Sequence, residues 1–449
     1  MESGGAIYQN TVAVGLLSSL FGVEPKVAKD YVGKHFRKKP QDVIANNVAA
    51  LERGYAEGER LMSSGKARIS LKRNGEIASE PLVSGAEAMA LGAIAGGCNF
   101  ISAYPMTPST GVFTFLSQHS KEFGIVAEQA EDEISAMNMS LGAWYAGARA
   151  LVSTAGGGFA LMVEGLSLAG MIESPIVINL AQRPAPATGL PTRTEQGDLE
   201  LALYAGHGEF PRIILAPGTV EEAFNLTQKA FNLADKYQMP VFILTDQYLA
   251  DSYYNLPSLD LKGLNVEKSI IKTDEGYRRY ALTPDGISPR GIPGHGSGLV
   301  VVDSDEHDEE GHITEDLKVR SRMVDKRLRK LEAAKADAIA PTLIGGKYYK
   351  TLVVCWGSNR GPVAEALSRL KRTDVSAAHF SQVYPLHKDT ASMLARAKRL
   401  VIVENNATSQ FGRLLRLHTG FDITKRILKY DGMPFSVEEL EKRIGEEIK

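Results

Sequence analysis

The sequence predicts an α/β fold: a parallel sheet flanked by helices, followed by a second, smaller α/β domain and preceded by a short helical segment. Two observations support this prediction. From Pro81 onward, helices rich in small residues alternate with short β-branched strands, which is typical of a doubly wound parallel sheet. The alternation stops near Leu256 and resumes at Lys347. At 449 residues and 44% hydrophobic content, the chain is also too long for one ordinary core.

The first segment, residues 1–70, is predicted to be helical. Apolar residues recur at helical spacing in residues 13–20 and 40–60, and residues 34–39 form a basic connector. A segment of this size has too little core to fold well alone.

Two α/β domains are predicted, at residues 81–255 and 341–449. The expected strands are residues 151–154, 176–180, 240–244, 351–355, 375–380 and 400–403. Between the domains, residues 256–340 are rich in Pro, Gly and charge, and residues 316–337 form a highly charged helical run. We therefore expect a linker followed by an exposed helix.

Composition argues against several classes of protein. The 51 basic and 53 acidic residues give a net charge of -2, so no field draws nucleic acid or anionic lipid to the surface. The apolar residues 11–23 are too few to span a bilayer and follow no basic region, which favours a cytoplasmic protein. Cys98 and Cys355 lie far apart, so neither a disulfide framework nor an iron–sulfur ligand set is expected.

The first stretch that could carry chemistry is residues 103–110, Ala-Tyr-Pro-Met-Thr-Pro-Ser-Thr, directly after a predicted strand. Pro105 and Pro108 fix φ on either side of Thr107, which predicts a rigid loop at a strand's carboxyl end. Such edges bind ligands in open α/β sheets, and a hydroxyl held in this way loses little entropy on binding. The alternative is a proline turn in which Ser109 caps a helix.

Next, three acids, Glu131, Asp132 and Glu133, lead into an apolar helix expected over residues 134–146. Acids in a first helical turn are ordinarily partners of the helix dipole, and that alternative stays open. An acid beside so apolar a face can instead be partly desolvated, which suits proton exchange.

A strand, three glycines and a helix follow, at residues 151–155, 156–158 and 159–170. This order, with a tight turn at the glycines, lets a ligand approach the backbone closely. The pattern lacks both the GxGxxG spacing and the GK[ST] ending of nucleotide-binding loops, so a nucleotide-binding function loses its best support.

Arg183 follows the strand at residues 176–180 and could clamp a carboxylate through two parallel hydrogen bonds. The alternative is a surface salt bridge. Downstream, His207, Glu209 and Arg212 are interpreted as structural hydrogen-bonding residues.

No metal site is predicted in this chain. His307 and His312 lie in an acid-rich stretch, but their spacing matches no standard zinc arrangement. A solvated acidic loop is expected there instead.

The motifs taken together resemble the α subunit of 2-oxoacid:ferredoxin oxidoreductases. They occur in family order as Tyr104-Pro105-Met106-Thr107-Pro108, Glu131-Asp132-Glu133, Gln182-Arg183, Gly189-Leu190-Pro191-Thr192, Glu195-Gln196-Gly197-Asp198-Leu199 and Gly206-His207-Gly208-Glu209-Phe210-Pro211-Arg212. The resemblance covers about Pro81 to the C-terminus and is closest to 2-oxoglutarate enzymes. The last domain resembles the C-terminal domain of transketolase, and the first 62 residues resemble the end of the family's γ domain, whose front half we expect to be absent or on a separate γ chain.

The resemblance implies a thiamine-diphosphate enzyme in which this chain supplies the pyrimidine-binding half. Glu133 matches the glutamate that activates the pyrimidine, Tyr104 and Pro105 lie at the cofactor, and Thr107 and Arg183 match the residues that hold the substrate carboxylate. The Gly-Asp-Gly motif of the diphosphate domain is missing from the sequence. A β subunit is therefore implied, carrying the diphosphate site, its Mg²⁺ and an iron–sulfur cluster, in an (αβ)2 assembly with coenzyme A as co-substrate and ferredoxin as electron acceptor.

Three alternatives to a 2-oxoglutarate enzyme stay open. The substrate could be pyruvate or a branched-chain 2-oxoacid, because part of the side-chain pocket could lie on β. A non-catalytic scaffold is the second alternative. A generic Rossmann oxidoreductase is the third, and the missing dinucleotide fingerprint argues against it.

Overall fold

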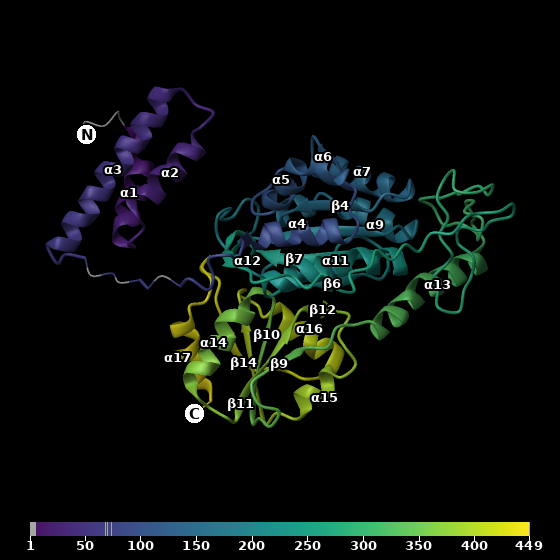
Figure 1. Ribbon diagram of the computed structural model, residues 1–449. Helices are drawn as coiled ribbons and strands as arrows, with labels where there is room; N and C mark the ends of the chain where they lie inside the picture. Colours follow the sequence, from purple (N-terminus) through teal and green to yellow (C-terminus); the bar gives the residue numbers. More distant parts are fainter. Residues whose placement is uncertain (1–5, 68, 70, 73, 449) are drawn as a thin grey trace. The chain divides into compact units, whose positions relative to one another are not determined.

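The computed structural model describes residues 6–67, 69, 71–72 and 74–448. The chain divides into two compact units, Met1–Ser79 and Glu80–Lys449, each considered by itself. The described residues of the first unit form a short 3-10 turn, η1 (Ala6–Tyr8), and three helices, α1 (Gln9–Leu20), α2 (Pro25–His35) and α3 (Gln41–Ser63) (Figure 1). Helix α2 occupies most of the stretch between the two expected helices, and only its end overlaps the predicted basic connector. Gly15 and Gly54 let α1 and α3 approach closely, because a Cβ at either position would collide with the backbone of the other helix.

The second unit contains a seven-stranded sheet in the order β12-β6-β7-β5-β4-β2-β3. Figure 1 labels its strands β4, β7, β6 and β12. Its strands are β2 (Phe100–Ala103), β3 (Val126–Gln129), β4 (Ala150–Thr154), β5 (Ile176–Gln182), β6 (Ile213–Leu215), β7 (Pro240–Asp246) and β12 (Gln382–Tyr384). All neighbours in this sheet pair in parallel except β12, which runs antiparallel to β6. The strand β12 belongs to the C-terminal part of the chain, so the two predicted α/β domains share one sheet.

Two groups of helices flank this sheet. The helices of this region are α4 (Gly85–Ala95), α5 (Thr110–Gln118), α6 (Ser120–Phe123), α7 (Glu133–Tyr145), α8 (Gly156–Phe159), α9 (Val163–Met171), α10 (Leu199–Tyr204), α11 (Val220–Tyr237) and α12 (Gln247–Asp251). Right-handed crossovers place α5 and α11 on one face of the sheet and α7 and α9 on the other. A small antiparallel pair, β1 (Leu82–Ser84) with β8 (Tyr253–Asn255), lies beside α4 and α12.

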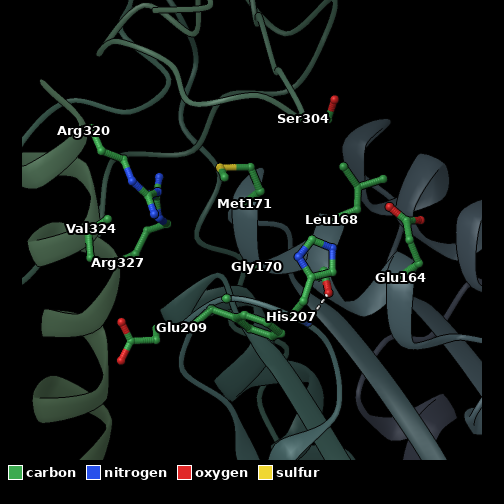
Figure 2. Close-up of a pocket in the computed structure, with 13 residues that line it drawn as sticks. Glu164, Leu168, Gly170, Met171, His207, Glu209, Ser304, Arg320, Val324 and Arg327 are labelled. Atoms are coloured by element: carbon green, nitrogen blue, oxygen red, sulfur yellow. Dashed lines mark hydrogen bonds between the residues drawn. The ribbon is translucent and has the colours of Figure 1, made fainter. Parts of the chain in front are cut away.

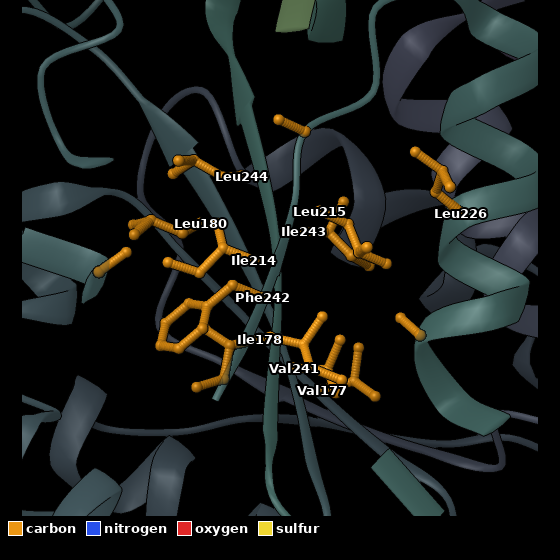
Figure 3. Packing of buried hydrophobic residues seen from close by; sticks show 14 of the residues in the cluster. Val177, Ile178, Leu180, Ile214, Leu215, Leu226, Val241, Phe242, Ile243 and Leu244 are labelled. Carbon is orange, nitrogen blue, oxygen red and sulfur yellow. The ribbon is translucent and has the colours of Figure 1, made fainter. Parts of the chain in front are cut away.

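The core of the sheet is aliphatic and closely packed around β5, β6 and β7. Ile178, Ile214 and Phe242 are fully buried in it (Figure 3). Phe159 of α8 packs edge-on against Phe242, with ring centroids 5.3 Å apart. Strands buried on both faces account for the continuous apolar runs in the sequence.

The C-terminal part is a five-stranded sheet in the order β14-β13-β10-β11-β9, with β9 antiparallel to β11. Its strands are β9 (Thr342–Ile344), β10 (Thr351–Trp356), β11 (Val375–Phe380), β13 (Arg399–Glu404) and β14 (Lys425–Leu428). Its helices are the 3-10 turn η2 (Gly357–Asn359), α14 (Arg360–Leu370), α15 (Thr390–Ala395), α16 (Gln410–Thr419) and α17 (Val437–Glu447). The α/β class predicted from the sequence is confirmed.

The stretch at residues 256–340, expected to be a linker and an exposed helix, is packed against the first sheet's helices. Its helix is α13 (Leu317–Ala336), and one face of that helix buries Lys326 and Lys330 against the carboxylate of Glu173. Lys326 Nζ lies 2.6 Å from Glu173 Oε1. The charged sequence gave no sign of this burial, because the acid that pairs with both lysines lies far away in the chain.

Candidate functional site

The carboxyl ends of β2 and β4 form the switch point of the seven-stranded sheet. The chain leaves β2 towards β3 on one side and leaves β4 towards β5 on the other. Ligands of open α/β sheets bind in the crevice at such a point. The segments that border it are the loop at residues 104–109 after β2 and the three glycines of α8 after β4.

Glu133 lies beside this crevice as the first residue of α7, and its side chain is only 4% exposed. Asp132 is the residue that caps the helix, since its side chain accepts a hydrogen bond from Ser135 N at 2.7 Å. Glu133 Oε1 is buried without a hydrogen-bond partner in the described residues. A buried acceptor left unpaired costs about 1–3 kcal/mol, which a donor on a bound ligand would remove.

The glycines after β4 allow this placement of Glu133. A Cβ at Gly158 would lie 2.6 Å from Glu133 Oε1 and would collide with the Thr154 hydroxyl. The tight turn expected here is instead the short helix α8, because Phe159 N donates to Ala155 O at 2.8 Å. The expected helix at residues 159–170 accordingly splits into α8 and α9.

Thr107 and Arg183 meet across the crevice. Arg183 is buried after β5, and its Nη1 donates to Thr107 O at 2.7 Å. The hydroxyl of Ser109 donates to Met106 O at 2.6 Å, which fixes the same loop from within. Thr107 itself is exposed. A buried guanidinium with further N–H groups and a nearby hydroxyl is suited to binding a carboxylate, and a surface salt bridge does not describe Arg183.

Sequence reasoning missed two carboxyls, Asp198 near Arg183 and Glu195 near Asp198. Burial raises the pKa of Asp198 to about 6, and the charge of Arg183 opposes this shift. Burial raises the pKa of Glu195 to about 7, with a smaller contribution from the charge of Asp198. Both lie in the Glu195-Gln196-Gly197-Asp198 motif, but no spacing rule identifies which of its polar residues are buried.

Tyr104 and Pro105 are exposed at the carboxyl end of β2. Of the three residues interpreted as structural, Arg212 fits that interpretation, since it is buried and donates to Ala202 O and Ala205 O at 2.9 and 2.8 Å. The side chains of His207 and Glu209 are exposed instead.

His207 and Glu209 line a separate hollow of about 290 Å³ between α9, the loop at residues 206–210 and α13 (Figure 2). Arg320 and Arg327 border it from α13, and both are paired with Glu306. The backbone N–H of His207 donates to Ser167 Oγ at 2.9 Å. This hollow contains neither Glu133 nor Arg183.

The acidic stretch with His307 and His312 is only partly solvated. His307 is fully buried, packs against the ring of Tyr280 in a tilted arrangement with centroids 3.9 Å apart, and forms a hydrogen bond with Asp305 O at 3.0 Å through Nδ1. Within the described ranges, no group of three or more His, Cys, Asp or Glu side chains is arranged to hold a metal ion. No helix in these ranges is both long and apolar enough to cross a membrane.

Comparison with known proteins identifies the family. Residues 91–326 match the family described as pyruvate flavodoxin/ferredoxin oxidoreductase, thiamine diphosphate-binding, and residues 1–57 match the pyruvate ferredoxin/flavodoxin oxidoreductase family. The chain is 36% identical over 462 residues to the α subunit of 2-oxoacid:ferredoxin oxidoreductase 1 of Sulfurisphaera tokodaii, covering 98% of this chain and 72% of that one. The chain belongs to the 2-oxoacid:ferredoxin oxidoreductase family. As an α subunit of these oxidoreductases, it acts together with a partner subunit.

Two further 2-oxoacid:ferredoxin oxidoreductase relatives are similar to this chain. The 2-oxoglutarate synthase subunit KorA of Archaeoglobus fulgidus is 33% identical over 332 residues, covering 73% of this chain and 88% of that one. The structure of 2-oxoglutarate:ferredoxin oxidoreductase from Magnetococcus marinus, with 2-oxoglutarate, coenzyme A and succinyl-CoA bound, matches with a TM-score of 0.88 at 33% identity, covering 100% of this chain and 79% of that one. The resemblance seen in the motifs is confirmed.

Proposed function

We propose that this chain supplies the pyrimidine half of a thiamine-diphosphate site in a complex that oxidatively decarboxylates a 2-oxoacid, with 2-oxoglutarate as the first substrate to test. The observation that carries the proposal is the buried Oε1 of Glu133, which has no hydrogen-bond partner among the described residues and lies at the switch point that the loop with the Thr107–Arg183 contact also borders. The Magnetococcus structure, which has 2-oxoglutarate, coenzyme A and succinyl-CoA bound, supports the choice of substrate and of coenzyme A as co-substrate.

The residues present fit the cofactor's pyrimidine. When bound, thiamine diphosphate supplies the carbanion chemistry by which a 2-oxoacid loses carbon dioxide. Oε1 of Glu133, which has no hydrogen-bond partner in the described residues, would exchange a proton with a ring nitrogen of the bound pyrimidine. Such general acid–base help contributes about 100- to 10,000-fold to a rate. Tyr104 and Pro105 are exposed at the end of β2, where they would contact the bound cofactor.

Thr107 and Arg183 hold the substrate carboxylate in this proposal. Nη1 of Arg183 donates a hydrogen bond to Thr107 O. The other N–H groups of the guanidinium would donate two parallel hydrogen bonds to the substrate carboxylate. The hydroxyl of Thr107 lies in a loop fixed between prolines, so little entropy is lost when it binds. Together the two residues orient the 2-oxoacid before reaction.

A β subunit is the proposed partner, contributing the diphosphate site, its Mg²⁺ and an iron–sulfur cluster in an (αβ)2 assembly that passes electrons to ferredoxin. The two cysteines of this chain, Cys98 and Cys355, are buried, and burial raises the pKa of each thiol to about 12, so neither is a ready cluster ligand. Near the crevice, Ile134, Leu161 and Leu190 are large, apolar and exposed, which suits docking of another chain. Because ferredoxin and coenzyme A are cytoplasmic molecules, we also propose a cytoplasmic location.

Purification of the native complex followed by a dye-reduction assay tests this proposal. We expect reduction of a viologen under strict anoxia that depends on both coenzyme A and 2-oxoglutarate, and a fall of about 100- to 10,000-fold in the variant Glu133→Gln. Faster turnover of pyruvate or a branched-chain 2-oxoacid would correct the substrate. Equal activity of Glu133→Gln would instead support the scaffold alternative, and the purified material also shows whether a γ chain joins the complex.

A further inference from the structure

Asp198 lies at the crevice without a role in the proposed function. It directly precedes α10, its side chain is 5% exposed, and its backbone N–H donates to Gln182 Oε1 at 3.0 Å. The carboxyl group faces α8, since a Cβ at Gly156 would lie 2.6 Å from Asp198 Oδ1. Its Oδ2 is buried and has no hydrogen-bond partner in the part of the chain that the structure describes.

The segment that carries Asp198 is held firmly by the C-terminal part of the chain. Gln196 Nε2 donates to Trp356 O at 3.0 Å, and Gln196 Oε1 accepts from Asn359 Nδ2 at 2.8 Å. On the backbone, Gln196 N donates to Asn405 O at 2.7 Å, and Gly197 O accepts from Gln410 Nε2 at 2.7 Å. The unpaired oxygen of Asp198 is therefore fixed in place.

Few charged groups act on Asp198. Arg183, directly after β5, is the cation that favours the ionised form of Asp198, and Glu195 is the neighbouring acid on its own segment. The glycines of α8 contribute only backbone. On the side of the C-terminal part, Asn406 and Gln410 are neutral, and Arg413 is paired with Glu200.

We propose that Asp198 is a positioning residue that balances the charge of Arg183 in the free site and takes up a proton when a substrate carboxylate binds at Arg183. This inference rests on the proposed function, which brings the carboxylate to Arg183. The incoming carboxylate adds a negative charge to a buried site in which Arg183 is the neighbouring cation. Neutralising a carboxyl is the least costly response, because an unpaired charge is strongly disfavoured away from water.

Burial supports the choice of Asp198, because it already raises the pKa of this carboxyl to about 6. A like charge nearby raises a carboxyl pKa further. If substrate binding raises it by about one to two units, binding at pH 7 takes up about 0.4 to 0.8 proton per site. The proton comes from solvent, and no bond of the substrate is broken.

Calorimetric titration of the thiamine-loaded complex with N-oxalylglycine, the unreactive amide analogue of 2-oxoglutarate, tests the inference at pH 7. Titration in two buffers with different ionisation enthalpies gives the number of protons taken up. We expect uptake in the wild type, its loss in Asp198→Asn, and its retention in the matched variant Glu195→Gln. We also expect the KM for 2-oxoglutarate to rise with pH between about 6 and 8 in the wild type and to be flat in Asp198→Asn.

The outcomes separate this inference from the proposed function. Uptake that survives in Asp198→Asn but disappears in Glu195→Gln would overturn the inference, because the titrating group would then be Glu195. An active wild-type complex that binds the analogue without proton uptake would overturn it as well and leave the proposed function standing. A wild-type complex that turns over no 2-oxoacid would overturn both.

Discussion

Gly158→Ala is the change that most directly tests the placement of Glu133. Gly158 lies in α8, where an alanine backbone is acceptable and would gain about 1 kcal/mol in helix propensity. The new methyl group would lie 2.6 Å from Glu133 Oε1, so the carboxyl must move. Overpacking of this kind costs about 1–3 kcal/mol of the free energy of unfolding. A displacement of about 1 Å of a catalytic group lowers the rate about 100-fold.

The assay is dye reduction by the purified complex, with thermal unfolding measured in parallel. Gly157→Ala is the matched control, because a Cβ at Gly157 meets only Ala187 O, at 3.7 Å. We expect Gly157→Ala to keep its activity and stability. Equal losses in the two variants, or full activity in Gly158→Ala, would refute the argument that Glu133 packs against this glycine.

Three further predictions concern other parts of the chain. Arg183→Lys keeps the positive charge but removes the planar guanidinium, so the KM for the 2-oxoacid should rise about 10- to 100-fold in steady-state assays. An unchanged KM would contradict binding of the substrate carboxylate at Arg183. Glu173→Gln leaves Lys326 and Lys330 buried without their carboxylate, so denaturant unfolding should show a decrease of about 3–5 kcal/mol in the free energy of unfolding. A decrease under about 1 kcal/mol would contradict a buried ion triad. Because the folded pKa of Asp198 is raised to about 6, the native state binds more protons than the unfolded state between about pH 4 and 6, and stability falls as pH rises through that window. The free energy of unfolding of Asp198→Asn should therefore exceed that of the wild type by about 3 kcal/mol at pH 8, and the two should be equal near pH 4. A difference in unfolding free energy that does not change with pH would show that the carboxyl is not desolvated.

Local sequence patterns predicted β4, β5, β7, β10, β11 and β13, whereas several short strands were not among the predicted elements. Apolar runs predicted β5, β10 and β11, because strands buried on both faces are largely apolar. Strand β11 also buries Ser376 and His379. Strand β12 gave no signal, since its three residues form a strand only through pairing with β6, whose residues lie far away in the chain. Helix α11 was not among the predicted elements although it is amphipathic and capped by Thr219.

The candidate site also has residues that local patterns indicate and residues whose position depends on distant parts of the chain. Local patterns drew attention to Thr107, to Arg183 and to the acids at residues 131–133, because each follows a strand or begins a helix. The choice of Glu133 among those acids came from the family resemblance. Asp198 was missed because its burial depends on Gln182 and on the C-terminal part of the chain. The charge pattern of α13 wrongly predicted an exposed helix for the same reason, since Glu173, the acid that pairs with its buried lysines, lies just after α9.

The antiparallel pairing of β12 with β6 also covers the outer side of β6. Without the C-terminal part, β6 would present unpaired N–H and C=O groups along one side of the sheet, and such a bare edge is a template for another chain. A strand contributed from so late in the sequence means that this edge stays open during synthesis until residues 382–384 have emerged from the ribosome. Until then the side of β6 that β12 covers is open to pairing with another strand.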